Sequence, residues 1–343
     1  MRYEDEQIAN LILSLKKLKG VGNKTIQKIL RDNKKELEST SNYTSNFLIN
    51  LKNKSVIKGL DNTNIDWTTI QKNVANSLEI AYEKNISVLH PYMSEYPQRL
   101  LVNENFPPIL FCKGDITILN SSKIVAVIGT REPTEFGKKM GLRLSSLLSA
   151  DGYVIVSGLA VGCDTIGHLG ALEATGKTIA VLPTPIDKSV YPKENQKLAD
   201  DIVEAGGLLV SEYEPGSQLQ GRELVANLVA RDEWQAGLSD GVIAIETSVT
   251  GGSNHAIKHA IKTETPLALF DYSSRLGDKF FEEDRYSGNV KYIRSNEAKP
   301  IFVQETVDSF KKDMKEYHSS LIFKDWTFKK REIPKETKQI KLF

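Results

Sequence analysis

The sequence has few cysteines and no long apolar run. Cys112 and Cys163 are the two cysteines among 343 residues, which excludes a disulfide framework and favours a reducing compartment. No apolar stretch reaches the ~18 residues that a membrane-spanning helix needs. The opening residues, M-R-Y-E-D-E-Q, are too acidic for a secretory signal. We therefore expect a cytoplasmic protein with no membrane partner.

The chain also lacks a strong net charge, although its charges are unevenly spread. Residues 1–86 carry 14 Lys and Arg against 10 Asp and Glu, and residues 318–343 carry 7 against 3. The stretch between them carries 24 basic against 31 acidic residues. A nucleic-acid binder would therefore need local cationic clusters on an acidic body.

From Ile86 onward, short apolar segments alternate with helical ones. Helices are predicted over 135–150, 164–175 and 194–205, and strands near residues 86–90, 108–112, 124–129, 153–157, 178–182, 207–211, 241–246 and 266–270. The strand candidates are continuously apolar, which indicates a sheet buried on both faces. We expect an α/β fold with a doubly wound, mostly parallel, Rossmann-like sheet.

The two ends of the chain differ from this middle part. Residues 1–85 are predicted to form a small helical domain, and residues 86–317 the α/β domain. A Gly20-Val21-Gly22 turn between two amphipathic segments resembles a helix-hairpin-helix element, in which glycine lets the backbone approach a DNA phosphate. A plain connector within a helical bundle is the alternative. Residues 318–343 are charged and poor in apolar residues, so we expect a mostly disordered tail.

Two small-residue turns follow neighbouring strands and carry the main functional signal. Gly129-Thr130-Arg131 ends one strand and Ser157-Gly158 ends the next, each before a helix. Such turns at strand ends bind phosphate through backbone N–H groups and helix dipoles, and Arg131 could pair with that phosphate. The sequence therefore predicts a phosphorylated ligand, whereas a structural salt bridge is the alternative for Arg131.

Other pairs of polar residues are weaker candidates. His255 and His259 have helical spacing but lack the glutamate of the H-E-x-x-H pattern, so no metal site is expected. Asp164 is expected to be a helix N-cap with His168 packing on the first turn, which makes catalysis by this pair a minor alternative.

A series of motifs along the chain resembles one known family. In order, these are Y-P-Q-R-L-L from Tyr96, V-A-V-I-G-T-R from Val125, V-S-G-L-A from Val156, G-K-T-I-A-V-L from Gly176, G-G-L-L-V-S-E-Y from Gly206 and A-G-L-S-D from Ala236. Residues 287–289 and 299–301 resemble its closing loop. The order and spacing are similar to those of the DNA-processing protein A (DprA/Smf) family over about residues 10–305.

The resemblance implies a homodimer that binds single-stranded DNA and helps to load a RecA-type recombinase, with no enzymatic turnover and no cofactor. The residues that it assigns to DNA binding are Gly129, Thr130, Arg131, Ser157, Gly158, Lys177 and Arg231. Lys177 lies on a turn with no other functional signal. The alternative for Lys177 is a role without DNA contact. For the dimer we predict a sheet-edge surface after Glu223 that includes Leu224, Val225, Leu228 and Trp234.

The chain departs from the family before the A-G-L-S motif. The family has R-N-R-I there, whereas this chain reads Arg231-Asp232-Glu233-Trp234-Gln235, so one arginine is kept and two positions are acidic. The family's C-terminal winged helix is not evident. These departures indicate a divergent member with altered DNA contacts.

The last five residues resemble the short motif by which bacterial replication and repair proteins bind the sliding clamp. Gln339, Ile340, Leu342 and Phe343 occupy its Gln, aliphatic, Leu and Phe positions around Lys341. A short tail of this kind can bury Leu and Phe in an apolar groove. Packing of the tail on its own domain is the alternative.

A second functional class is a nucleotide-derived ligand sensor or a phosphoribohydrolase-like enzyme of the wider Rossmann-like superfamily. Those enzymes carry P-G-G-x-G-T-x-x-E, whose glutamate is catalytic. Here the nearest match is Thr250-Gly251-Gly252-Ser253, with no acidic residue at the corresponding position, and Glu246 is expected to end its strand. The residues therefore favour binding over hydrolysis.

Overall fold

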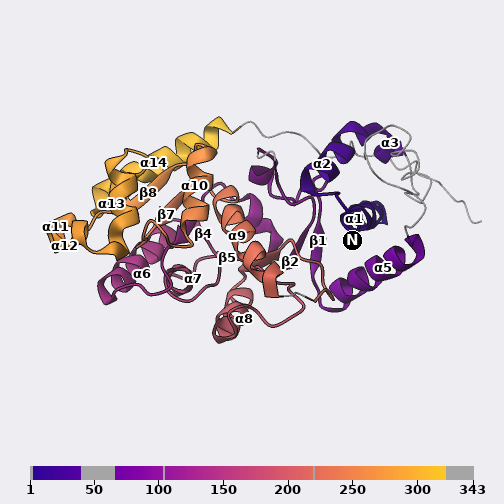
Figure 1. The fold of residues 1–343 in the computed structure, drawn as a ribbon, viewed down its shortest axis with the longest axis horizontal. Helices are drawn as coiled ribbons and strands as arrows, with labels where there is room; N and C mark the ends of the chain where they lie inside the picture. The colour runs from indigo at the N-terminus through magenta and orange to yellow at the C-terminus, as the bar shows by residue number, and fades with distance from the viewer. Residues whose placement is uncertain (1–2, 40–65, 103–104, 219–220, 322–343) are drawn as a thin grey trace, which may run out of the picture.

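The computed structural model describes residues 3–39, 66–102, 105–218 and 221–321. Within these ranges nine strands form one sheet in the order β1-β2-β6-β5-β4-β3-β7-β8-β9 (Figure 1). The strands are β1 (Ser87–Leu89), β2 (Leu110–Gly114), β3 (Ile124–Ile128), β4 (Val154–Ser157), β5 (Thr178–Val181), β6 (Leu208–Ser211), β7 (Gly241–Ala244), β8 (Leu267–Phe270) and β9 (Lys299–Ile301). β2 pairs antiparallel with β1 and β6, and every other pairing is parallel. The prediction of a mostly parallel α/β sheet is confirmed.

Helices cover both faces of this sheet because successive side chains of each strand point to opposite sides. In β3, Val125 and Val127 pack into a cluster with apolar residues of α6 (Glu135–Ala150), α7 (Cys163–Glu173) and α14 (Gln304–Ser320). The alternate β3 residues belong to a second cluster, which includes residues of α9 (Gly221–Gly237) and α10 (Asn254–Lys262). Continuous apolar strands are therefore required here.

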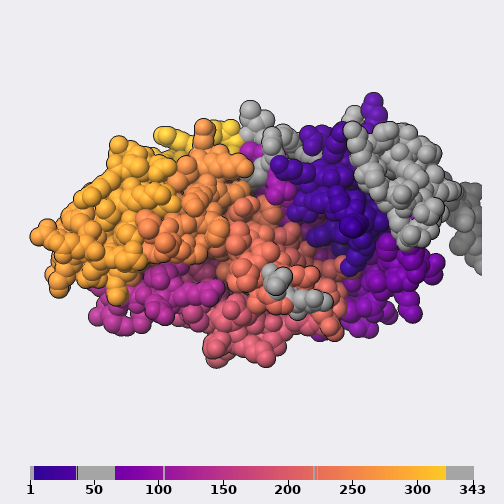
Figure 2. Space-filling model, in the orientation of Figure 1, coloured from indigo at the N-terminus to yellow at the C-terminus, as the bar shows by residue number. Residues whose placement is uncertain are grey.

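The remaining helices flank this three-layered centre. They are α1 (Tyr3–Lys16), α2 (Asn23–Asp32), α3 (Lys34–Ser39), α5 (Trp67–Glu83), α8 (Gln196–Glu204), α11 (Ser273–Leu276), α12 (Lys279–Glu282) and α13 (Ser287–Arg294), with 3₁₀ turns at Gln98–Val102, Ile116–Asn120, Lys193–Asn195 and Asp284–Tyr286. Figure 2 shows the N-terminal helices at one end of the molecule and the α13–α14 segment at the other.

The strand order reverses between β3 and β7. From β3 the chain builds β4, β5 and β6 on one side, and it then returns to place β7, β8 and β9 on the other side. The segments that leave β3 and β7 therefore diverge at their carboxyl ends and open a crevice between them. In open α/β sheets, ligands bind at this switch point.

The N-terminal helices share their core with the sheet, since buried residues of α1 and α2 belong to the same cluster as β1 and β2. Gly20 has a φ of +80°, which explains why the α1–α2 turn contains glycine. Asn23, at the start of α2, donates from Nδ2 to Glu212 Oε2 over 3.5 Å. The predicted glycine turn thus exists and lies beside the end of β6, whereas DNA binding by this turn stays a prediction.

The structure differs from the sequence-based predictions at the C-terminal end of the α/β domain. Residues 299–301 form the edge strand β9 instead of a closing loop, because an edge position tolerates Pro300. Residues 287–289 begin α13, and the helix α14 continues to Ser320, three residues into the predicted tail. The rest of that tail, from residue 322, lies outside the described residues.

The surface predicted for dimerisation is also different. Residues 224–234 belong to the helix α9 and not to a sheet edge. Trp234 is buried, and its indole Nε1 donates to Glu212 Oε1 over 3.0 Å, so this ring cannot face a partner. Val225 is 64% exposed.

No helix among the described residues combines the length and the apolar character that crossing a bilayer requires.

Candidate nucleic-acid interface

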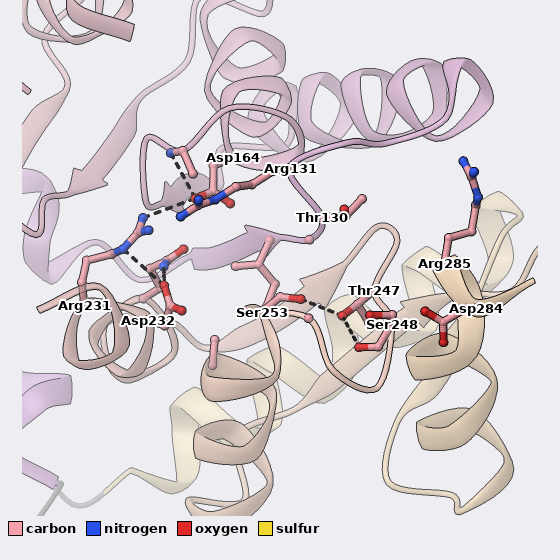
Figure 3. Close-up of a pocket in the computed structure, with 17 residues that line it drawn as sticks. Thr130, Arg131, Asp164, Arg231, Asp232, Thr247, Ser248, Ser253, Asp284 and Arg285 are labelled. Carbon is pink, nitrogen blue, oxygen red and sulfur yellow. Dashed lines mark hydrogen bonds and ion pairs between the residues drawn. The ribbon is translucent and has the colours of Figure 1, made fainter. Parts of the chain in front are cut away.

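A cleft of about 590 Å³ opens at the carboxyl ends of β3 and β7, where the strand order reverses. It is lined from five places in the chain: the turn after β3, the segment from β4 into α7, helix α9, the turn between β7 and α10 with the start of α10, and the 3₁₀ turn before α13. Figure 3 shows Arg131, Asp164, Arg231 and Asp232 together on one wall, with Arg285 on the opposite side. The cleft thus combines segments that are distant in the sequence.

The turn after β3 requires glycine because three chain segments meet there. A Cβ on Gly129 would lie 2.6 Å from Cys163 Sγ and 2.9 Å from the carbonyl oxygen of Glu246. The Thr130 N–H donates to that same carbonyl oxygen over 2.7 Å. This N–H is therefore already used within the turn, and DNA contact by Thr130, which lines the cleft, stays a prediction.

Arg131 extends from this turn into the cleft and is exposed. Within the described part of the chain, no hydrogen bond or ion pair holds its guanidinium group. The alternative of a structural salt bridge therefore finds no support among these residues. A guanidinium group in this state is free to form charge-assisted hydrogen bonds with an anion.

Arg231, on α9, lies in the cleft wall but is already paired. Its Nη1 is 3.3 Å from Asp164 Oδ2, and its Nε is 3.2 Å from Asp232 Oδ1. Gly158 leaves room for this side chain, since a Cβ there would overlap the Arg231 guanidinium. Ser157 is buried, and its hydroxyl donates to the Val127 carbonyl over 2.6 Å. Ser157 and Gly158 thus support the site from behind and do not line the cleft.

The two carboxylates beside Arg231 are poorly solvated. Burial raises the pKa of Asp232 to about 7, although Arg231 lowers it. Burial also raises the pKa of Asp164, again against the effect of Arg231. Asp164 is not the N-cap of α7, because that position is held by Gly162 and the Asp164 carboxylate instead accepts from the Ala160 N–H over 3.3 Å. The predicted capping role is therefore wrong.

The turn between β7 and α10 is a part of the cleft that was considered in the sequence only as an incomplete catalytic motif. Thr247, Ser248, Gly251, Gly252 and Ser253 all line the cleft. Asn289 holds this turn in place from beneath, since its Oδ1 accepts from the Thr247 N–H over 2.9 Å. The signal was present, because Thr-Gly-Gly-Ser follows an apolar strand and precedes a helix, as in the other two turns.

Glu246 does not end β7, which stops at Ala244. Its carboxylate accepts from the Thr134 N–H over 2.9 Å and from the Thr134 hydroxyl over 2.6 Å. Thr134 is the N-cap of α6, and Gly137 leaves the space that this carboxylate occupies. The Glu246 carboxylate thus stabilises the start of α6 and does not line the cleft.

Lys177 lies elsewhere. It precedes β5, at the edge opposite the carboxyl ends of the strands, and its Nζ donates to the Ala205 carbonyl over 2.7 Å. The cleft and Lys177 are therefore not one continuous site, and contact between Lys177 and DNA stays a prediction.

The neighbours of the candidate histidines indicate structural roles for their side chains. His168 is buried, and its Nδ1 lies 2.7 Å from the Thr178 hydroxyl, which itself donates to the Ile155 carbonyl. Burial lowers the pKa of His168 to about 3, so it is neutral at physiological pH. His259 faces Glu233 on α9, with 3.9 Å between Nδ1 and Oε2, and His255 is exposed.

Comparisons with known proteins identify the family of this chain. Residues 87–312 match the sequence profile of the family described as DNA recombination-mediator protein A. The chain belongs to this family.

Relatives in the DNA recombination-mediator protein A family are similar over much of the α/β domain. The chain is 34% identical over 194 residues to DNA processing protein DprA of Bacillus subtilis, covering 55% of this chain and 63% of that protein. It is 40% identical over 158 residues to DprA of Streptococcus pneumoniae, covering 46% of this chain and 53% of that protein. The matches thus span about half to three-fifths of these relatives.

Two solved structures from the same family resemble this fold. The X-ray structure of DprA from Streptococcus pneumoniae superposes with a TM-score of 0.66 at 25% identity, covering 88% of this chain and 97% of that one. A DprA structure from Helicobacter pylori, described by its unique single-stranded DNA binding mode, has a TM-score of 0.56 at 30% identity, covering 68% and 97%.

Proposed function

We propose that this chain binds single-stranded DNA in the cleft between β3 and β7 and acts in DNA recombination or uptake. The observation that carries the proposal is the exposed guanidinium of Arg131, which extends into the cleft without a partner among the described residues. DNA phosphates are bound by such groups. Membership of the family and the DNA-binding relative from Helicobacter pylori support the same ligand.

A second surface next to Arg131 favours a single strand over a duplex. Tyr191 is 37% exposed, and with Val161 and Leu228 it lines a hollow of about 40 Å³ that also contains Arg131. Aromatic rings beside a cationic groove stack with unpaired bases, which a duplex keeps inside its helix. We infer that one nucleotide places its phosphate at Arg131 and a neighbouring base on Tyr191.

We further propose that the protein acts by binding, without catalytic turnover. The carboxylate of Glu246, next to the cleft, accepts hydrogen bonds from Thr134 and faces α6. A nucleotide-derived ligand is the second candidate, because a cleft of about 590 Å³ falls within the range of ~300–1,000 Å³ typical of small-molecule sites.

The proposed partners are those that the family resemblance implies. We propose a cytoplasmic homodimer that delivers its DNA to a RecA-type recombinase, with the exposed Val225 and its neighbour Leu224 in the dimer surface. A Val225→Lys variant should then have half the mass of the wild type in light scattering at micromolar concentration. A monomeric wild-type protein would contradict the dimer. The sliding-clamp motif, Gln339–Phe343, lies outside the described residues and stays a proposal.

A titration against single-stranded DNA, duplex DNA and mononucleotides, at two salt concentrations, tests the proposed function. We expect the tightest binding to single-stranded DNA, with a strong salt dependence. Displacement of the DNA by a low concentration of one mononucleotide would instead favour the small-ligand candidate.

A further inference from the structure

The charges that line the cleft cancel. Among its described lining residues are three arginines (Arg131, Arg231 and Arg285) and three aspartates (Asp164, Asp232 and Asp284). A site for a polyanion normally has a cationic excess. The balanced charge of the cleft is therefore unusual for a site that binds a phosphodiester chain.

Asp232 is the carboxylate in the best position to oppose a phosphate. Its Oδ1 lies 3.2 Å from Arg231 Nε and also accepts from Gln235 Nε2 over 3.0 Å. Its side chain is 16% exposed, whereas that of Arg231 is 5% exposed. The carboxylate thus lies beside the Arg231 guanidinium and is the more exposed of the two, at the wall where Arg131 also lies (Figure 3).

We propose that Asp232 is a built-in competitor of DNA phosphate: its carboxylate neutralises Arg231, and removal of its charge lets the cleft bind a single strand more tightly. This inference rests on the proposed function, since it requires the strand to enter this cleft. Two cations, Arg131 and Arg231, would then face the strand with Asp164 as the remaining anion on that wall. Asp232 in this way sets the affinity of the site.

The same arrangement makes binding depend on pH. Asp232 changes charge near neutrality because burial raises its pKa to about 7. The charged groups that act on it are Arg231, Asp164 and Arg131, and the Gln235 amide donates to it. Protonation of Asp232 at lower pH removes its negative charge, so affinity for DNA should rise as pH falls from about 8 to about 6.

Helix α10 packs on α9 and contributes further titratable groups. Burial lowers the pKa of His259 to about 4, so His259 stays neutral over this pH interval. Lys258 and Lys262 are further basic residues of this helix, and His255 is exposed on its first turn. A variant of Asp232 leaves all four unchanged, and their effect therefore cancels in a comparison with the wild type.

The adjacent residue provides a matched control. Glu233 follows Asp232 on α9, is 40% exposed and does not line the cleft. Asp232→Asn and Glu233→Gln remove the same charge from the same turn of helix. Binding of a labelled oligothymidylate to the full chain is measured by fluorescence anisotropy at constant ionic strength, at about pH 8 and about pH 6.

At about pH 8, Asp232→Asn should bind about threefold to tenfold more tightly than Glu233→Gln, as expected of one charge acting over a few ångströms in partly solvated protein. Wild type and Glu233→Gln should bind more tightly at the lower pH, and Asp232→Asn should lose most of that response. Equal affinities of the two variants, or an unchanged pH response in Asp232→Asn, would overturn the inference.

An Arg131→Ala variant distinguishes a failure of this inference from a failure of the proposed function. Weaker binding in that variant, together with no effect of Asp232→Asn, would leave the DNA site in place and reject the role of Asp232. Unchanged binding in Arg131→Ala would instead reject the cleft as the DNA site. If Asp232→Asn does not fold, the wild type decides, because affinity that does not rise between about pH 8 and about pH 6 contradicts the inference.

Discussion

Replacing Arg131 by alanine should weaken single-stranded DNA binding by about 1–2 kcal/mol, a loss of roughly 5- to 30-fold. A charge-assisted contact with phosphate contributes up to ~3 kcal/mol. The lower part of that range applies here because Arg131 is exposed, and solvent screens its charge. The fold should be preserved, since no hydrogen bond or ion pair within the described residues depends on the Arg131 guanidinium.

Fluorescence anisotropy with a labelled oligonucleotide at low salt measures this effect. Loss of one phosphate contact should also reduce the slope of log affinity against log salt by about 0.7, the value for one contact with a single strand. Arg131→Lys should give an intermediate affinity, because lysine keeps the charge but lacks the planar fork of donors.

Arg143→Ala is the matched control, because Arg143 is exposed on α6 and does not line the cleft. It removes the same charge from the chain without changing the proposed site. The reasoning is refuted if a folded Arg131→Ala protein binds as tightly as the wild type. It is equally refuted if Arg143→Ala loses as much affinity, since the effect would then reflect net charge alone.

Three further predictions concern stability and the tail. Gly129→Ala should lower the free energy of unfolding by about 1–3 kcal/mol, because the added Cβ would lie 2.6 Å from Cys163 Sγ; an unchanged urea midpoint would contradict the tight packing of this turn. Burial lowers the pKa of His168 to about 3, whereas its ordinary pKa is 6.5. Below about pH 6.5 the unfolded chain therefore binds a proton on His168 that the folded chain does not bind. Stability should therefore fall as pH drops from about 6.5, by up to ~1.4 kcal/mol per pH unit for this group, and a His168→Gln variant unfolded by urea should show a shallower dependence. Deleting residues 339–343 should abolish co-elution with the sliding clamp and leave DNA affinity nearly unchanged; clamp binding by the truncated chain would reject the motif.

The local pattern of the sequence was enough to predict most elements of the α/β domain. The helix predicted over 135–150 has those bounds in the structure, and each of the eight predicted strand segments overlaps a strand. Apolar runs and helical periodicity are local properties, so they are visible without the fold. The β9 strand was missed because its three residues include a proline, which a sheet tolerates only at an edge.

The site was predictable in part for the same reason. Gly129 and Arg131 were found because a glycine turn after a buried strand is a local signature of a phosphate site. The Thr-Gly-Gly-Ser turn before α10 has the same signature, and it was weighed only as a failed match to a catalytic motif. By analogy with the other two strand-to-helix turns, this turn could have been predicted to lie beside Arg131.

Most elements, the mostly parallel sheet and the turn that carries Arg131 could be predicted from the sequence, because they follow from side-chain periodicity and backbone freedom over a few residues. Which charges meet depends on the tertiary structure. Asp164 and Arg231 are 67 positions apart, and Thr134 and Glu246 are 112 apart. The order of the strands brings each pair together, and the resulting burial, which no local pattern encodes, gives Asp232 its raised pKa beside Arg231.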